Sequence, residues 1–351
     1  MDTYILVSGV DYFNFTGIFS QLAKDRKKEI IENEIKNPSE ELKFIFFDFK
    51  SGKVTETITK ITKEGKKKKV IKEKETEIAR YRSISRENYK RSPNFRGTMS
   101  ITHVYDKICE IGKNAPGTLK ELSFFSHSYK DGPILVNSID RYDIYINVRD
   151  PDDRDARIRD FVCCDAIKSH DLFKKAFHKD GFSWIWGCTV DDELKDLINL
   201  IRKQSGKRDN IPDSATFTLY HKNHKRLFRN YGVIDQLPSG PLIVTFAQIK
   251  ALLCIALKNT YDYNLALTSD KKVYATFVGV GAKFEEKPPA PGRKKLMRSD
   301  PDRKKIIEFY KKYLKIKTDP TGRNYAEYLP NLPCESYLIS LYKQRGSNTR
   351  V

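Results

Sequence analysis

The chain has 351 residues, 39% of them hydrophobic and 12% aromatic, which is enough for a sizeable core and argues against a disordered chain. Its 65 Lys and Arg residues against 46 Asp and Glu residues give a net charge of +19, which favours encounters with acidic partners. No run of about 18 apolar residues is present, so we expect no transmembrane segment.

Short apolar segments bounded by turn residues alternate with helical patterns along most of the chain. Continuous apolar segments of this kind are typical of strands that are buried on both faces of a parallel sheet. We predict an α/β fold: a central, mostly parallel sheet of five to six strands with helices on both faces. The predicted strands, of which the third and fourth are adjacent, lie near residues 3–10, 42–49, 122–127, 182–187 and 272–280.

The segment 53–83 has period-two stretches on either side of Glu64 and Gly65, which predicts a long β-hairpin inserted after the second strand. We expect this hairpin to be exposed and to lie outside the core. Residues 51–100 hold 15 Lys and Arg against 6 Asp and Glu, a surplus of nine positive charges. A solvated surface is the simpler interpretation of this charge, and a polyanion or an acidic protein is the partner it would favour.

The loop 147–161, between the third and fourth strands, interleaves five Asp residues with four Arg residues. The arginines cancel the negative field that Ca²⁺ requires, so we do not predict a calcium site. We expect mutual salt bridges on a surface loop, which could also close over a substrate.

Beyond residue 188, an amphipathic helix begins at Asp191, and residues 240–267 predict a largely buried helix. Three prolines then predict a linker at 285–298. A helix follows near 299–317, with Ser299 or Asp300 as its cap and Pro301 at its first position. The predicted organisation is an α/β domain at 1–284, the linker at 285–298 and a C-terminal helical segment at 299–351.

Two predicted strands end in residues that carry chemistry. His127 and Ser128 end the third strand, and Gly187 and Cys188 end the fourth. Because active groups of α/β sheets gather at the carboxyl ends of the strands, the thiol and the imidazole can form a nucleophile and base pair. The N-terminus of the following helix would lower the thiol pKa. Gly187 would allow a sharp turn, and Gly132 would leave room for a substrate backbone.

The two endings, "LSFFSHS" and "SWIWGC", resemble the signature of the caspase-like superfamily of cysteine peptidases, which includes caspases, legumains, gingipains and clostripain. The resemblance implies a caspase-like topology for residues 3–284. It also implies Cys188 as nucleophile, His127 as general acid and base, and an oxyanion hole from backbone N–H groups near Ser128 and Cys188. Two features depart from that signature. Ser128 stands where most members have Gly, and "WGCTVD" replaces the caspase motif.

The function we predict is therefore a cysteine peptidase acting on a protein or peptide substrate, which could be a delivered effector. One alternative is a non-catalytic basic protein that binds, serves as cargo or builds a larger assembly, because a fold does not imply a function. A second alternative is a serine hydrolase using Ser128, although Lys130 fits a nucleophile elbow badly.

The remaining expectations concern metals, cysteines and compartment. Six cysteines show no spacing typical of a metal site or a disulfide framework, so we expect free thiols in a reducing compartment. The histidines likewise lack partners at ligand spacing, and we expect neither a metal nor another cofactor. The N-terminus lacks the basic start of a signal peptide, which favours a cytoplasmic protein, or one exported by a dedicated secretion or injection system.

Overall fold

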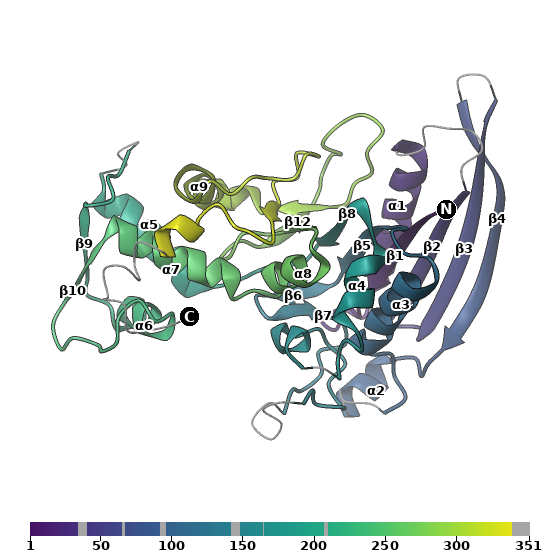
Figure 1. Cartoon of the computed structure of the whole chain (residues 1–351), viewed down its shortest axis with the longest axis horizontal. Coiled ribbons are helices and arrows are strands. Elements are labelled where there is room, and N and C mark those ends of the chain that lie inside the picture. The colour runs from purple at the N-terminus through teal and green to yellow at the C-terminus, as the bar shows by residue number, and fades with distance from the viewer. Residues whose placement is uncertain are drawn as a thin grey trace.

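The computed structural model describes residues 1–33, 41–64, 67–91, 96–141, 148–163, 165–206 and 210–338. Over these residues, eight strands form one sheet in the order β14-β11-β8-β5-β1-β2-β3-β4 (Figure 1). Five neighbouring strands run parallel: β1 (Asp2–Ser8), β2 (Glu41–Asp48), β5 (Leu119–Phe125), β8 (Phe177–Ile185) and β11 (Lys272–Ala275). These are the five predicted strands, and the predicted α/β class with a mostly parallel sheet is confirmed.

The two edges of the sheet are antiparallel. At one edge lies β14 (Ala326–Tyr328), which pairs with β11. At the other edge β3 (Lys53–Glu64) pairs with β2, and β4 (Lys67–Arg80) pairs with β3. The predicted hairpin is therefore present, but the expectation that it lies outside the core is wrong for β3. Its Val54, Thr57 and Thr59 are buried because their strand continues the central sheet.

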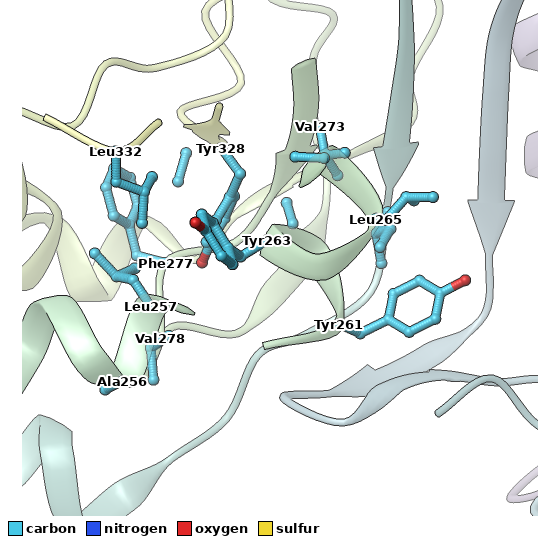
Figure 2. Close-up of a cluster of buried hydrophobic side chains, with 14 of the residues drawn as sticks. Ala256, Leu257, Tyr261, Tyr263, Leu265, Val273, Phe277, Val278, Tyr328 and Leu332 are labelled. Atoms are coloured by element: carbon cyan, nitrogen blue, oxygen red, sulfur yellow. The ribbon is translucent and has the colours of Figure 1, made fainter. Parts of the chain in front are cut away.

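Side chains alternate between the two faces of the sheet, and each face has its own buried cluster. Ile5 and Val7 of β1 face a cluster formed with helices α3 (Ile101–Asn114), α5 (Asp192–Gln204), α7 (Phe246–Lys258) and α8 (Tyr261–Ser269). Figure 2 shows part of this cluster, where Tyr263 and Leu265 of α8 lie beside Val273 and Tyr328 of the sheet.

Tyr4 and Leu6 point to the opposite face, which is covered by α1 (Ile18–Asn33) and by the returning C-terminal chain. Here Arg26 donates two hydrogen bonds to Glu121, of 3.0 and 2.7 Å. Arg323 reaches Glu29 at 3.3 Å, and all four side chains are almost fully buried. Buried charges persist where each is paired, so this cluster fixes the C-terminal chain against α1.

The segment predicted as a linker packs on the same face. The ribbon of β12 (Ala282–Phe284) and β13 (Met297–Ser299) is antiparallel, and residues 285–296 connect its two strands. Glu285 accepts hydrogen bonds from the Leu296 N–H at 3.0 Å and from Arg323 at 3.3 Å. We call residues 282–299 the strap, because they cross this face as a held segment.

The C-terminal part that the structure describes contains β14 in addition to helices. Asp300 caps the 3-10 helix η3 (Pro301–Arg303), as one of the two predicted cap residues. The helix α9 (Lys304–Phe309) and the π-helix η4 (Tyr310–Leu314) follow. Residues 339–351 of the predicted helical segment lie outside the described residues.

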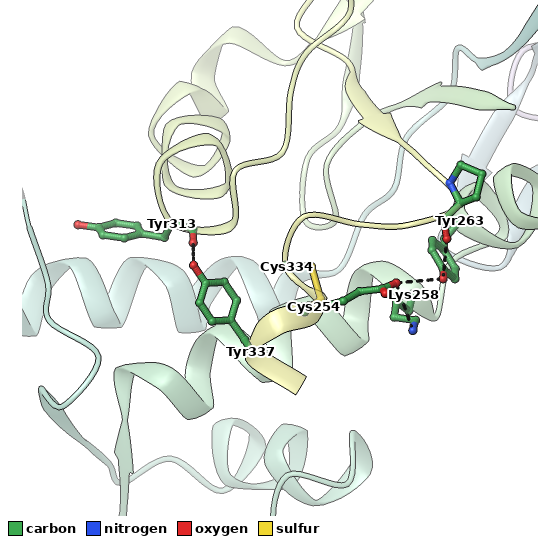
Figure 3. The surroundings of a disulfide bond; sticks show 8 residues. Cys254, Lys258, Tyr263, Tyr313, Cys334 and Tyr337 are labelled. Carbon is green, nitrogen blue, oxygen red and sulfur yellow. Dashed lines mark hydrogen bonds and ion pairs between the residues drawn. A yellow bond between two sulfur atoms is a disulfide. The ribbon is translucent and has the colours of Figure 1, made fainter. Parts of the chain in front are cut away.

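The C-terminal chain is also joined to α7 covalently. A disulfide links Cys254 of α7 to Cys334, so the expectation of free thiols is wrong for these two residues (Figure 3). Beside it, Tyr337 donates a hydrogen bond to the Tyr313 carbonyl at 3.1 Å. The two cysteines are 80 residues apart in the sequence, and this pairing could not be predicted because spacing along the chain does not determine which cysteines meet in space.

The remaining elements are short. They are the helices α2 (Arg86–Arg91), α4 (His170–Ala176) and α6 (Lys222–Asn230), the 3-10 helix η2 (Ile158–Phe161), and the strand pairs β6 (His127–Tyr129) with β7 (Gly132–Ile134) and β9 (Thr216–Leu219) with β10 (Leu242–Thr245). The helix expected at 240–267 is thus β10, α7 and α8, with Thr260 capping α8. None of the described helices is long and apolar enough to cross a membrane.

Candidate functional site

The ends of β5 and β8 lie against each other at the carboxyl edge of the sheet. The two strands pair in parallel, with Phe124 opposite Ile185, and the chain beyond each pair leads to His127 and to Cys188. A Cβ atom added to Gly187 would lie 2.4 Å from the Ser128 Cβ and 2.8 Å from the Ser126 carbonyl oxygen. Only glycine allows this approach, so the sequence places the two strand ends in direct contact.

The His127 ring is held by an acidic residue and by aromatic side chains. Its Nε2 lies 3.3 Å from Asp11 Oδ1, at the end of the neighbouring strand β1. The rings of Tyr12, Phe13 and Phe19 surround it, with centroids 4.7, 5.0 and 5.0 Å away. A carboxylate facing one ring nitrogen fixes the orientation of an imidazole and leaves the other nitrogen for proton transfer.

Asp11 is held as a carboxylate. Its burial alone would raise its pKa, but hydrogen bonds from Thr16, His127 and the Asn14 N–H outweigh burial and lower that pKa. Thr16 Oγ1 donates to Asp11 Oδ2 at 2.5 Å, and the Asn14 N–H donates to Oδ1 at 3.3 Å. The loop after β1 therefore supplies an ionised group at the same edge as His127.

Cys188 lies in a different environment. It is half-buried, and the Ala282 N–H of the strap donates to its sulfur at 3.1 Å. Burial raises the pKa of the thiol, the Ala282 N–H opposes that rise, and nearby Asp300 adds to it. The expectation that helix α5 lowers this pKa is wrong. Burial of the thiol dominates, and the N-cap Asp191 together with Asp192 and Glu193 in the first turn offsets the positive end of the helix dipole.

The two halves of the site share a neighbour but no hydrogen bond. Within the described ranges, no hydrogen bond joins His127 to Cys188. Tyr12, whose ring contacts His127, also interacts electrostatically with the thiol. Burial, followed by acidic neighbours that include Tyr89, Asp155 and Cys188, raises the Tyr12 pKa to about 12. His127 and Cys188 thus occupy one edge of the sheet, with the thiol turned to the strap.

Ser128 and Gly132 have packing roles in the structure. The Ser128 hydroxyl is buried and turns to the Tyr129 carbonyl oxygen, 3.4 Å away. Gly132 has φ +142, and a Cβ atom there would lie 2.7 Å from the Ala156 carbonyl oxygen. The space beside Gly132 is therefore filled by the protein itself, which corrects the interpretation that it is open to a substrate.

The loop after β7 is braced by a buried network of Asp and Arg residues. Asp155 Oδ1 accepts hydrogen bonds from the Leu135 and Val136 N–H groups, each at 2.7 Å, and Oδ2 accepts one from the Ser138 N–H at 2.7 Å. Arg157 pairs with Asp153 at 2.7 Å. The predicted salt bridges exist, but the expectation of a surface loop is wrong, since most of these side chains are buried.

A shallow hollow opens between Asp11 and the strap. It is lined by Asp11, Asn14, Thr16, Gly17, Ile18, Gln21 and Phe284. Phe284 is half-exposed and belongs to β12, the same strand whose Ala282 holds Cys188. A substrate entering this hollow would meet Asp11 on one side and Phe284 of the strap on the other, while neither His127 nor Cys188 lines it. In the part of the chain that the structure describes, no group of three or more His, Cys, Asp or Glu side chains is placed to hold a metal ion.

Two residues of this site were missed from the sequence. Asp11 follows directly after the first predicted strand, so its position at the shared edge could have been inferred. Ala282 could not be predicted, because it contributes only its backbone N–H group, which leaves no pattern in the sequence. Comparison with known proteins adds no relative: no family model, curated protein or solved structure matches the chain. The mostly parallel sheet is compatible with a caspase-like fold.

Proposed function

We propose that the chain is a cysteine peptidase in which Cys188 is the nucleophile, His127 the general acid and base, and Asp11 the residue that orients His127. The contact of the β5 and β8 ends, together with the Asp11–His127 pair, carries this proposal. Nucleophile, base and orienting group are the three roles that such a site requires.

In the proposed reaction, His127 takes the proton of the Cys188 thiol, and the thiolate forms a bond to the carbonyl carbon of a peptide. Backbone N–H groups at the two strand ends, near Ser128 and Gly187, would stabilise the oxyanion. When the C–N bond breaks, His127 gives its proton to the leaving amine. Water, deprotonated by His127, then hydrolyses the thioester, releases the carboxylic acid and restores the thiol.

The position of the strap sets a condition on this reaction. The Cys188 sulfur accepts a hydrogen bond from Ala282, and its raised pKa keeps the thiol protonated at neutral pH. Because the Ala282 N–H group lies against the sulfur, the strap must move away before a carbonyl carbon can reach the nucleophile. The resting state that follows is one with an ordered base and a covered nucleophile.

The experiment compares Cys188→Ala with Ser128→Ala in one assay of peptide cleavage. Loss of the nucleophile should lower the rate by about 10⁴-fold or more, whereas Ser128→Ala should keep most of the activity. A peptide with a thiol-reactive electrophile should label the wild type and Ser128→Ala but not Cys188→Ala. Circular dichroism of each variant controls for folding.

A non-catalytic binding protein is the second candidate. The raised thiol pKa and the net charge of +19 favour it, because both suit a basic surface with an inert cysteine. Equal cleavage by the wild type, Cys188→Ala and His127→Ala, or no cleavage by any of them, would replace the peptidase with this alternative.

A further inference from the structure

A second hollow lies between α1 and the hairpin edge of the sheet, and we call it the α1 groove. Its floor is apolar, formed by Leu6, Ala23, Ile31, Phe44 and Phe46. Polar side chains form its two walls. Gln21, Lys24, Lys27, Lys28 and Glu32 come from α1, and Thr55, Thr57, Glu73 and Glu75 come from β3 and β4.

The groove exists because the sheet is wider than the helix that covers it. Phe44 pairs with Thr57, and Thr57 pairs with Glu75, so these three residues lie on one face of β2, β3 and β4. On the same face, α1 packs against β1 and β5, at the other side of β2. Phe46 is consequently only half-buried, although its strand lies inside the sheet. Faces of α/β sheets are normally covered by helices, and within the described ranges no helix covers the strip beside α1.

The two walls of the α1 groove carry opposite charges. Lys27 of α1 forms an ion pair with Glu73 of β4 across the groove. Lys28 lies 3.4 Å from Asp25, and its side chain is 59% exposed. Lys24 and Glu75 are both exposed, and among the described residues neither forms an ion pair. A ligand that fills the groove must therefore present acidic side chains to the α1 wall and basic side chains to the β4 wall.

We infer that the α1 groove binds an amphipathic helix of a protein partner, with an apolar stripe on Phe44 and Phe46 and oppositely charged flanks. A helix fits the site because α1 offers it a parallel neighbour, and packed helices lie about 8–10 Å apart. Anchors at i, i+3 or i+4, and i+7 would meet the apolar floor. This inference holds whether or not Cys188 is a nucleophile, since Cys188, His127 and Asp11 do not line the groove.

Synthetic peptides of about 16 residues test the inference, since that length matches the 16 residues of α1. The first probe carries a leucine stripe, Glu on one flank and Lys on the other. Matched peptides carry Glu on both flanks or Lys on both flanks, and a scrambled peptide has the same composition without the stripe. Binding to the full chain is measured by fluorescence anisotropy. We expect the mixed-flank peptide to bind at least tenfold more tightly than the scrambled one.

Variants of the protein test whether the peptide binds in the α1 groove and whether the charges of the two walls select it. Phe46→Asp should weaken the mixed-flank peptide by about 10- to 100-fold, because it puts a charge on the apolar floor. The double variant Lys24→Glu with Lys28→Glu makes both walls acidic and should prefer the peptide with Lys on both flanks. Glu75→Lys should prefer the peptide with Glu on both flanks. All these positions are exposed or half-buried, and circular dichroism checks their fold.

Several outcomes would overturn the inference. Equal binding of the scrambled peptide, or an unchanged affinity in Phe46→Asp, would remove the groove as the site. If the wall variants do not change which peptide binds most tightly, the inferred charge complementarity is wrong. Binding of dodecanoate that Phe46→Asp abolishes, without binding of any peptide, would show that the occupant is an acyl chain.

Discussion

The ends of β5 and β8 differ in how far their side chains are arranged for catalysis. At the β5 end, His127 is oriented by an ionised Asp11, and the loop after β7 is anchored by Asp155. At the β8 end, the Cys188 thiol is protonated, half-buried and bonded to the strap. The β5 half of the site is thus already ordered, whereas the nucleophile of the β8 half is covered by the strap. A site of this kind would be controlled through its nucleophile.

The largest effect should come from the anchor of the β5 half. Asp155→Ala leaves three buried N–H groups without an acceptor and removes a neighbour of Arg157, 3.6 Å away. We expect a loss of about 3–5 kcal/mol in the free energy of unfolding, measured by urea denaturation. The control Asp152→Ala, on the same loop but partly exposed, should change it by less than about 0.5 kcal/mol. Equal effects of the two would mean that this half is not braced.

The contact between the halves is tested next by Gly187→Ala. Its Cβ would press on the Ser126 carbonyl oxygen and on Ser128, which are not flexible side-chain ends. We expect a destabilisation of about 1–3 kcal/mol by thermal or urea denaturation. Gly240→Ala is the matched control, because a Cβ there meets nothing within 4 Å. If Gly187→Ala does not change the stability, the two strand ends are not in close contact.

The cover on the β8 half is tested by Glu285→Ala. The change removes the carboxylate that joins the two ends of the strap through Leu296 and holds the strap to Arg323. We expect iodoacetamide to alkylate Cys188 about tenfold faster, since about 1.4 kcal/mol in the opening equilibrium gives that factor. Mass spectrometry of the Cys188 peptide provides the rate.

The control for the strap is Glu286→Ala, at the exposed neighbouring position. Its alkylation rate should match that of the wild type. If Glu285→Ala also leaves the rate unchanged, the strap does not limit access to the thiol.

The smallest effect at mildly acidic pH should be that of Asp262, a buried residue whose Oδ2 lies 3.5 Å from Thr189 Oγ1. Burial raises the pKa of Asp262 to about 8. Between about pH 4 and pH 8 the carboxyl stays protonated in the folded chain and ionises in the unfolded chain, so stability falls as pH rises. Asp262→Asn should raise Tm by about 2–4 °C at pH 5 and by more at pH 8, and it should leave Tm almost unchanged near pH 4.

Asp196→Asn, on the exposed side of α5, serves as the control for that series. Its Tm should follow that of the wild type at every pH. A gain in Asp262→Asn of the same size at pH 4 and pH 8 would show that the effect is packing rather than ionisation.

The sequence predicted the five parallel strands well, because a buried strand such as β2 is a largely apolar run that the local pattern reveals. It failed where tertiary contacts decide. The burial of Asp153 and Arg157 depends on each pairing with the other, and the raised Cys188 pKa depends on the burial of the thiol in the folded chain. Neither leaves a local pattern. His127 and Cys188 were placed at the correct strand ends, while the Asp11 contact required the order of the sheet.

The outer strand β4 has a consequence for how the protein behaves among its own copies. Within the described part of the chain its far side has no strand partner, and such an edge invites pairing with another molecule. Glu73, Glu75 and Glu77 share one face of β4. In an antiparallel pair of two β4 strands centred on Thr76, Glu75 would face Glu77, and like charges directly opposed are unfavourable. In this register the like charges of β4 therefore oppose edge-to-edge pairing of two copies.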